Sequence, residues 1–291
     1  MKEIKFIDGK YFGYVDGKLV VKSASKYYVQ KKINEQSDSY VPEVVSTSTE
    51  FDINQRFGFV TDLVSMVAVG ANPSAVITGE GGLGKTFTVI QALRACGLRD
   101  ISDVEVGIVL PPKSTYRVVK GFSTAKGLYR ILFENQNSII VFDDCDSVLK
   151  NDDACNILKG ALDSFDKRII TWNTSRDDED LPRWFQFKGG IIFISNMPMN
   201  KIEQSIRSRA MCVDLEMTTS QKIERMEVIM QSSDFLPEVP MFIKRQALEL
   251  VNELKDRSRE VSLRTLIKAA RIASTNNPNW KSLAEYMLLQ G

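Results

Sequence analysis

The chain has 291 residues, 43% of them apolar, and its 38 basic side chains are almost balanced by 37 acidic ones. This composition supports a substantial folded core and excludes wholesale disorder, while the net charge of +1 excludes bulk attraction to nucleic acid. The sequence contains no histidine, which excludes Ser–His–Asp and Cys–His catalysis and most kinds of zinc site.

The first residues do not resemble a signal-peptide core, because Met1 is followed by Lys-Glu-Ile-Lys-Phe. No apolar run approaches the length that crosses a membrane. The four cysteines, Cys96, Cys145, Cys155 and Cys212, match neither a metal motif nor a disulfide framework. We therefore expect a cytoplasmic protein with reduced thiols and no membrane partner.

Residues 1–34 are predicted to form a small β-rich region. The pairs Asp8-Gly9 and Asp16-Gly17 stand between short β-prone runs, so we expect a β-meander within residues 3–30. The first 32 residues also contain eight lysines against three acids, and among them lie the aromatic residues Tyr11, Phe12, Tyr14, Tyr27 and Tyr28. This mixture suits a nucleic-acid surface, although a solvated sheet with a lysine-protected edge is the simpler interpretation. The mostly polar residues 35–51 are interpreted as a linker.

From residue 52 onward the sequence alternates between helical and strand patterns. A helix is predicted to bury a face made of Phe59, Leu63, Val64 and Val67. The elements predicted after it are a strand at 74–78, helices at 85–96, 124–134 and 152–165, and strands at 116–119, 139–142, 168–172 and 190–195. Such alternation favours an α/β fold with a parallel sheet covered by helices, here at 52–217. About four helices are expected after it, so residues 218–291 are interpreted as a small helical domain.

A phosphate-binding motif follows the first predicted strand of this region. The pattern G-x-x-x-x-G-K-[ST] is matched in full by Gly79-Glu80-Gly81-Gly82-Leu83-Gly84-Lys85-Thr86. The glycines let backbone N–H groups turn toward phosphate oxygens, and a helix is expected to begin behind them. Lys85 would contact the β- and γ-phosphates, and the Thr86 hydroxyl would bind Mg²⁺. A glycine turn without nucleotide is the alternative.

An acidic pair ends another predicted strand. Four apolar residues, Ile139 to Phe142, precede Asp143 and Asp144. Ligands bind at the carboxyl ends of the strands in open α/β sheets, so both acids should face the phosphate site. Asp143 is expected to hold Mg²⁺ and Asp144 to orient the attacking water, because phosphoryl transfer depends mainly on positioning and charge stabilisation. An acidic strand end that meets a turn is the alternative.

With these two motifs together, residues 52–275 resemble an AAA+ module, a P-loop domain followed by a helical lid. The resemblance implies ATP and Mg²⁺ as cofactors and hydrolysis of ATP to ADP and phosphate. It also implies a homo-oligomer, a hexameric ring in which ATP is bound between neighbouring subunits.

The resemblance assigns four further side chains. Asn196 ends Ile191-Ile192-Phe193-Ile194-Ser195-Asn196, which looks like the sensor 1 strand. Arg209, or failing that Arg207, is similar to the arginine finger that reaches the ATP of a neighbour. Arg264 looks like the lid's sensor 2, near the γ-phosphate. The alternatives are a polar turn for Asn196, surface salt bridges for the two arginines, and a solvated helical arginine in the lid.

Two features point to one branch of the family, which includes the viral superfamily 3 helicases. Residues 168–172 and 183–187 could pair as a hairpin, similar to a pre-sensor-1 hairpin that lines the ring channel, although a strand and a surface loop fit as well. The pairs Asp143-Asp144 and Ser195-Asn196 also look like that branch. Superfamily 3 proteins lack a C-terminal lid of the kind expected here, so the resemblance to them is partial.

Lys120-Gly121-Phe122 follows a predicted strand where AAA+ proteins have a pore loop. An aromatic residue there grips polypeptide in AAA+ unfoldases, whereas a lysine could contact phosphates. A simple turn with a core phenylalanine is the alternative.

Three functions are compatible with these features. The leading hypothesis is a ring-forming motor or switch on nucleic acid, such as a helicase or a replication or packaging accessory. The second is a protein-remodelling ATPase that acts on a protein client. The third is an ATP-dependent assembly scaffold with little turnover, since the carboxylate of Asp144 is shorter than that of glutamate and is expected to hold water less well.

Overall fold

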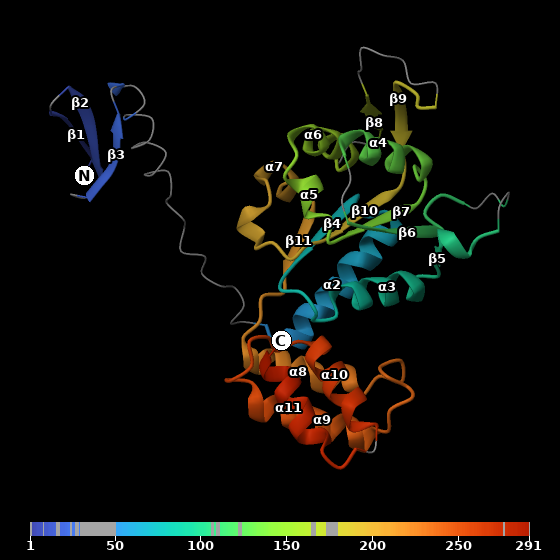
Figure 1. Cartoon of the computed structure of the whole chain (residues 1–291). Helices are drawn as coiled ribbons and strands as arrows, with labels where there is room; N and C mark the ends of the chain where they lie inside the picture. The colour runs from blue at the N-terminus through green and yellow to red at the C-terminus, as the bar shows by residue number, and fades with distance from the viewer. Residues whose placement is uncertain are drawn as a thin grey trace. The chain divides into compact units, whose positions relative to one another are not determined.

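The structure is a computed structural model that describes residues 2–7, 9–15, 18–23, 25–26, 29, 51–105, 108, 111–121, 124–163, 167–172, 180–275 and 277–290. The chain forms two compact units, residues 1–50 and residues 51–291, which are described separately (Figure 1). Residues 35–50 of the predicted linker lie outside the described residues. The finer division of the second unit at residue 217 stays a prediction.

The first unit contains the predicted β-meander. Strands β1 (Lys2–Ile7), β2 (Lys10–Val15) and β3 (Lys18–Ser23) form an antiparallel sheet in the order β1-β2-β3. Gly9, in the turn between β1 and β2, has a φ of 74°, a conformation that glycine adopts without strain. The second Asp-Gly pair, at 16–17, lies outside the described residues, as do Tyr27 and Tyr28.

A six-stranded parallel sheet forms the centre of the second unit. Its order is β11 (Met211–Asp214), β4 (Ser74–Thr78), β10 (Gly190–Ile194), β7 (Ile139–Asp143), β6 (Thr115–Lys120) and β5 (Arg99–Asp100). All residues of β4, β7 and β10 are buried, as expected for strands covered on both faces. Sequence analysis did not predict β5 and β11, which are short and half-exposed edge strands.

Helices cover both faces of this sheet (Figure 1). One apolar core contains residues of α2 (Ile53–Val69) and α3 (Lys85–Ala95). The other contains residues of α4 (Ala125–Glu134), α5 (Asp146–Leu149), α6 (Asp152–Ala161) and α7 (Gln204–Arg207). Two short 3-10 helices lie at Ile101–Asp103 and Met199–Lys201.

Two details of the predicted helices were wrong. The buried face of α2 is made by Phe57, Val60, Val64 and Val67, whereas Phe59 is 38% exposed. Phe59 is turned away from that stripe, and its ring packs edge-on against Phe51 with centroids 5.1 Å apart. The helix predicted to extend to residue 165 is assigned as α6 only to Ala161, and its capping position is Leu162.

The predicted hairpin is present as a separate two-stranded sheet. Strands β8 (Arg168–Thr171) and β9 (Trp184–Phe187) are antiparallel, and residues 173–179 between them lie outside the described residues. The guanidinium of Arg168 donates to the carbonyl oxygens of Ala161 at 2.9 Å and of Gly189 at 2.6 Å. The base of the hairpin is thereby attached to the α/β core.

The C-terminal helices form their own core. Helices α8 (Thr219–Met230), α9 (Met241–Leu254), α10 (Leu263–Ala273) and α11 (Trp280–Gln290) surround a third apolar cluster. Their number agrees with the expected four. Within the described ranges, no helix has the length and apolar character needed to cross a membrane.

Candidate nucleotide site

The glycine motif forms the turn between β4 and α3. Gly79 has a φ of 136°, and a Cβ there would lie 2.9 Å from the carbonyl oxygen of Leu215, so only glycine fits without a shift. Gly84, at the N-cap of α3, is left-handed with a φ of 88°. The helix therefore begins directly behind the loop, and its first N–H groups are directed at the space where a phosphate would sit.

Lys85 is buried at the start of α3, with only 5% of its surface exposed. Its Nζ donates to the carbonyl oxygens of Gly79 and Glu80, each at 2.7 Å, and to Asn196 Oδ1 at 3.0 Å. Burial lowers the pKa of Lys85 to about 8, against the opposing effect of nearby carboxylates, the largest from Asp144. The ammonium is thus held in a site that disfavours its charge, and a bound phosphate would relieve that cost.

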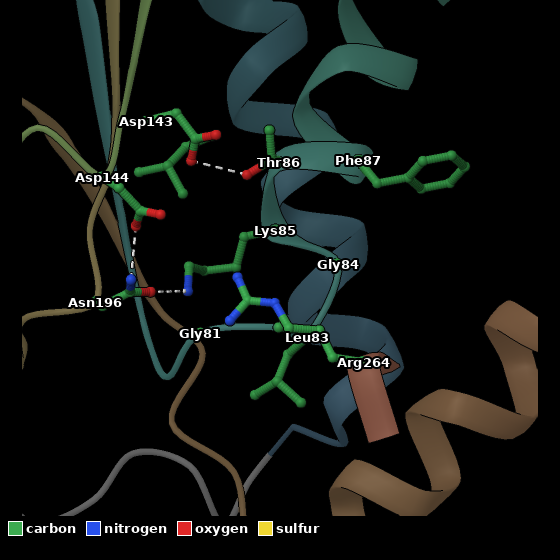
Figure 2. A pocket seen from close by; sticks show the side chains of 12 residues that line it. Gly81, Leu83, Gly84, Lys85, Thr86, Phe87, Asp143, Asp144, Asn196 and Arg264 are labelled. Carbon is green, nitrogen blue, oxygen red and sulfur yellow. Dashed lines mark hydrogen bonds between the residues drawn. The ribbon is translucent and has the colours of Figure 1, made fainter. Parts of the chain in front are cut away.

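Thr86 and Asp143 meet at the end of β7. The Thr86 hydroxyl donates to Asp143 Oδ1 at 2.8 Å, and the Asp143 side chain is only 7% exposed (Figure 2). Oxygen ligands of these two kinds suit Mg²⁺, which takes few protein ligands and completes its shell with water and phosphate. Lys120 Nζ lies 3.2 Å from Asp143 Oδ2, so the carboxylate already has a cationic partner. Thr86 and Asp143 are thus suited to hold a magnesium ion, whose charge would compensate that of a triphosphate.

Asp144 has an unusual backbone. Its φ is 56°, in the left-handed region that aspartate tolerates better than most residues, and its N–H donates to Ile194 O at 3.2 Å. Its Oδ1 accepts from Asn196 Nδ2 at 2.6 Å. Figure 2 shows that the two side chains meet across the adjacent ends of β7 and β10 and face Lys85.

The helical lid closes one side of the pocket. Leu263 N–H donates to Gly82 O at 2.8 Å, and Lys222 of α8 forms an ion pair with Glu80. Arg264, the first residue after that backbone contact, lines the same pocket as Lys85 and Asp144 (Figure 2). The C-terminal helices therefore contact the phosphate-binding loop at Glu80 and at Gly82.

The structure brings most of the sequence-predicted site residues together. The pocket is lined by Gly81, Gly82, Leu83, Gly84, Lys85, Thr86, Asp143, Asp144, Asn196 and Arg264. Gly79 and Glu80 contribute carbonyl oxygens that hold Lys85. Sequence reasoning did not place Phe87 and Ile194 in the pocket, which both of them line. It considered Lys120 only as a pore-loop lysine, whereas the structure pairs Lys120 with Asp143. The ring of Phe87 points away from the polar groups in Figure 2, so no motif would have marked it.

Arg207 and Arg209 do not line this pocket. Arg207 is half-buried, and its Nε donates to Ile202 O at 3.0 Å. Arg209 is exposed, and its guanidinium donates only to Ser205 O, at 2.9 Å, among the hydrogen bonds of the described residues. Their position outside the chain's own pocket is compatible with a role toward a neighbouring subunit.

The arrangement of these parts identifies the architecture. A P-loop joins β4 to α3 within a parallel sheet, β10 and β7 bring Asn196 and the two acids to the same edge, and a helical lid returns Arg264 to the phosphate pocket. The chain has the fold of an AAA+ ATPase. The AAA+ resemblance predicted from the sequence is confirmed at the level of fold.

Comparison with known proteins gives a sequence relative from a phage. No family model matches the chain. An uncharacterized 36.7 kDa protein of the nrdC-mobD intergenic region of Enterobacteria phage T4 is 29% identical to this chain over an alignment of 298 positions, and the alignment covers 95% of this chain and 86% of the phage protein. The phage relative fits the impression that the motifs resemble those of a viral branch.

Two solved structures align with most of the chain. The Aeropyrum pernix ORC1 protein in complex with DNA has a TM-score of 0.46 and 14% identity over 80% of this chain. C. elegans PCH-2 has a TM-score of 0.42 and 11% identity over 82% of this chain. The present chain spans 64% of the first solved chain and 66% of the second, slightly less than two thirds in each case.

Proposed function

We propose that this chain is an ATP-hydrolysing AAA+ motor or switch that assembles as a homo-oligomeric, hexameric ring and acts on nucleic acid. One observation supports the ATPase above all others. Lys85, Thr86, Asp143, Asp144, Asn196 and Arg264 come from distant parts of the sequence and line one pocket beside a phosphate-binding loop.

In this proposal the P-loop amides and Lys85 bind the β- and γ-phosphates. Lys85 now donates to two loop carbonyls and to Asn196, and phosphate oxygens would replace those acceptors. Thr86 and Asp143 would hold Mg²⁺, which supplies positive charge that neutralises the charge developing on the phosphate oxygens. The 2.8 Å hydrogen bond between their side chains supports this assignment, because it places both oxygens close together.

Hydrolysis needs a water aligned with the γ-phosphate, and Asp144 is the group proposed to orient it and to accept its proton. Asn196 holds one oxygen of Asp144 at 2.6 Å, and the carboxylate can turn its other oxygen toward water. Arg264 enters the pocket from the lid, where its charge would stabilise the transferring phosphoryl group. Asn196 and Arg264 would thus connect the phosphate to the sheet and to the lid.

The ring is proposed because, among the described residues, Arg264 is the arginine that lines the pocket, and neither Arg207 nor Arg209 reaches it within the same chain. Arg209 is exposed beyond α7 and can reach outward to the ATP of a neighbour, with Arg207 as the alternative. An arginine supplied in trans couples hydrolysis to assembly, since it stabilises the transition state only when two subunits meet. Ring formation and the choice of arginine are parts of the same proposal.

The β8–β9 hairpin supports nucleic acid as the partner. Its outer face carries Trp184, 62% exposed, opposite Thr171, and Ile169, 44% exposed, opposite Gln186. A solvent-exposed indole on a hairpin that stands off the ATPase core offers a flat surface for an unpaired base.

The decisive experiment measures phosphate release with and without single- and double-stranded DNA over a range of salt, together with native mass in the presence of ATP. DNA-stimulated turnover that falls with salt, and a hexameric mass, support the proposal. A matched pair of variants separates the parts: Lys85→Ala should abolish nucleotide binding, whereas Trp184→Ala should lose DNA stimulation and keep basal turnover. Stimulation by protein clients alone would contradict the choice of partner.

An assembly scaffold with little turnover is a second candidate, and one observation favours it. One of the two Asp144 carboxylate oxygens accepts from Asn196 Nδ2 at 2.6 Å, which leaves a single oxygen to orient a water. The same experiment decides, because nucleotide-dependent assembly without phosphate release is the result expected of a scaffold. Phe122, on which the protein-remodelling alternative depends, lies outside the described residues.

A further inference from the structure

The N-terminal sheet has two chemically different faces. Strand register puts Lys5 opposite Phe12 and Phe12 opposite Lys22, and the neighbouring rows pair Glu3 with Tyr14 and Ile7 with Lys10. Residues opposite one another share a face, so Lys5, Lys10, Phe12, Tyr14 and Lys22 lie on one side of the sheet, the lysine–aromatic face. Alternation puts Ile4, Phe6, Tyr11, Gly13 and Val21 on the other side.

The lysines of this face are exposed and lie over its rings. Lys22 Nζ is 4.7 Å from the centroid of Phe12, and Lys5 Nζ is 5.5 Å from that of Tyr14. Both rings are half-buried, and the lysine beside each ring is exposed. Long lysine side chains can lie along an apolar surface while the ammonium stays in water. Three lysines face one acid, Glu3, which lies 3.4 Å from Lys5 in an exposed pair.

We infer that the lysine–aromatic face is a binding site for single-stranded nucleic acid. An exposed cation–π contact contributes only about 0.5–1 kcal/mol, whereas an aromatic ring that stacks on a base contributes about 1–3 kcal/mol. A base can therefore displace the ammonium from Phe12 or Tyr14. The released lysine stays within reach of the phosphate beside that base, so both interactions are kept.

The spacing of the face suits a strand rather than a duplex. Phe12 and Tyr14 are two residues apart on β2, the central strand, and their side chains follow one another along the same face. Lys5 and Lys22 flank Phe12 from the two outer strands. Two rings in a row, with a lysine on each side, suit a single strand whose unpaired bases can stack on the rings while its phosphates meet the lysines. Paired bases in a duplex could not reach the rings.

This site goes beyond the proposed function, because it belongs to the other compact unit and needs no nucleotide. It would give the ATPase a second hold on its nucleic acid, at an effective concentration set by residues 30–50. The two ideas can fail separately. If variants of the N-terminal sheet lose DNA binding while the wild type shows no ATPase activity, this binding site is supported and the proposed motor function is contradicted.

The test uses the full chain and a fluorescent oligothymidylate, with anisotropy measured over a range of salt. Phe12→Leu and Tyr14→Leu keep apolar volume but lose the stacking face, and each should weaken binding by about 5- to 150-fold. Phe6→Leu is the matched control, since Phe6 is 61% exposed on the opposite face, and its binding should equal that of the wild type. Lys22→Gln should reduce the slope of log affinity against log salt by about 0.7.

Tyr14→Phe keeps the ring and should restore the affinity lost in Tyr14→Leu, which separates stacking from a folding defect. Equal binding of wild type, Phe12→Leu and Tyr14→Leu would overturn the inference. Duplex DNA bound as tightly as the single strand would also overturn it, as would binding confined to acidic proteins or to anionic lipid vesicles.

Discussion

Asn196 lies between Asp144 and Lys85: its Nδ2 donates to Asp144 Oδ1 at 2.6 Å, and its Oδ1 accepts from Lys85 Nζ at 3.0 Å. A single amide therefore touches both the group proposed to orient water and the group proposed to bind the γ-phosphate. If a phosphate oxygen replaces Asn196 as an acceptor for Lys85, the Asn196 amide can shift, and its hydrogen bond to Asp144 would change with it.

Asn196→Ala should reduce kcat by about 10²-fold, because Asp144 loses the donor that orients it. ADP binding should change little, since the P-loop amides remain in place. Phosphate release under saturating ATP and calorimetry with Mg-ADP measure the two quantities. An Asn196→Ala protein with wild-type kcat would contradict the assigned role.

Asp144→Asn should keep the fold and lose turnover by about 10²- to 10⁴-fold, because an amide accepts no proton from water. Asparagine tolerates the left-handed φ of 56° as well as aspartate does. Asp144→Ala should lose turnover to the same extent, and its free energy of unfolding should also fall by about 1–2 kcal/mol, because alanine disfavours a left-handed backbone. Thermal unfolding should therefore distinguish the two variants, and equal melting temperatures would argue against a strained backbone.

Binding of triphosphate should weaken as the pH rises through 8, the region of the lowered pKa of Lys85. ATP binds the ammonium form, and at pH 9 only about a tenth of a group with this pKa is protonated, so affinity should fall by roughly tenfold from pH 7. Titration calorimetry in buffers of different ionisation enthalpy should also detect proton uptake on binding. Lys85→Met should bind weakly at every pH.

The lowered pKa of Lys85 also makes the stability of the ligand-free protein depend on pH. Because the folded pKa of about 8 lies below the unfolded value near 10.5, the unfolded chain binds more protons in this window. The contribution of Lys85 to the free energy of unfolding should therefore increase from pH 8 to pH 10.5. Denaturant unfolding of wild type and Lys85→Met across this range isolates that contribution, and parallel pH curves would contradict it.

Lys120→Met should tighten Mg²⁺-dependent ADP binding by about two- to fivefold. The Lys120 ammonium lies 3.2 Å from Asp143 Oδ2 and competes with a metal ion for that carboxylate, but its side chain is 68% exposed, so the pair is weak. Mg²⁺ titrations at fixed ADP measure the change. Lys188→Met, at an exposed lysine after β9, is the matched control and should leave the titration unchanged.

Arg209→Ala should leave ATP binding and thermal stability unchanged and reduce hydrolysis by about 10³-fold or more, as expected for an arginine that acts in trans. Arg207→Ala should instead cost about 1 kcal/mol of stability, because Arg207 Nε holds Ile202 O at 3.0 Å. Mixing Arg209→Ala with Lys85→Ala subunits should recover partial turnover. If Arg207→Ala alone loses hydrolysis, the finger is Arg207.

Most of the correct predictions came from local sequence patterns. The glycine motif and the acidic strand were recognisable because each depends on a few consecutive residues whose spacing follows from backbone geometry. The hairpin of residues 168–187 was weighed against a loop, and its pairing was decided by contacts with Tyr129, whose ring packs on Phe185 with centroids 5.1 Å apart. The strand at 211–214 was missed, because four half-exposed residues carry too short a pattern.

The phosphate loop, the pair of acids after a buried strand and the helices after residue 217 could be predicted from the sequence, because they depend on short-range spacing and periodicity. Three contacts follow from the tertiary structure: Lys120 with Asp143, Lys222 with Glu80, and Asn196 with both Lys85 and Asp144. Such contacts join residues far apart in the chain. They depend on which strands become neighbours and on which way each strand end points, and no local pattern records either.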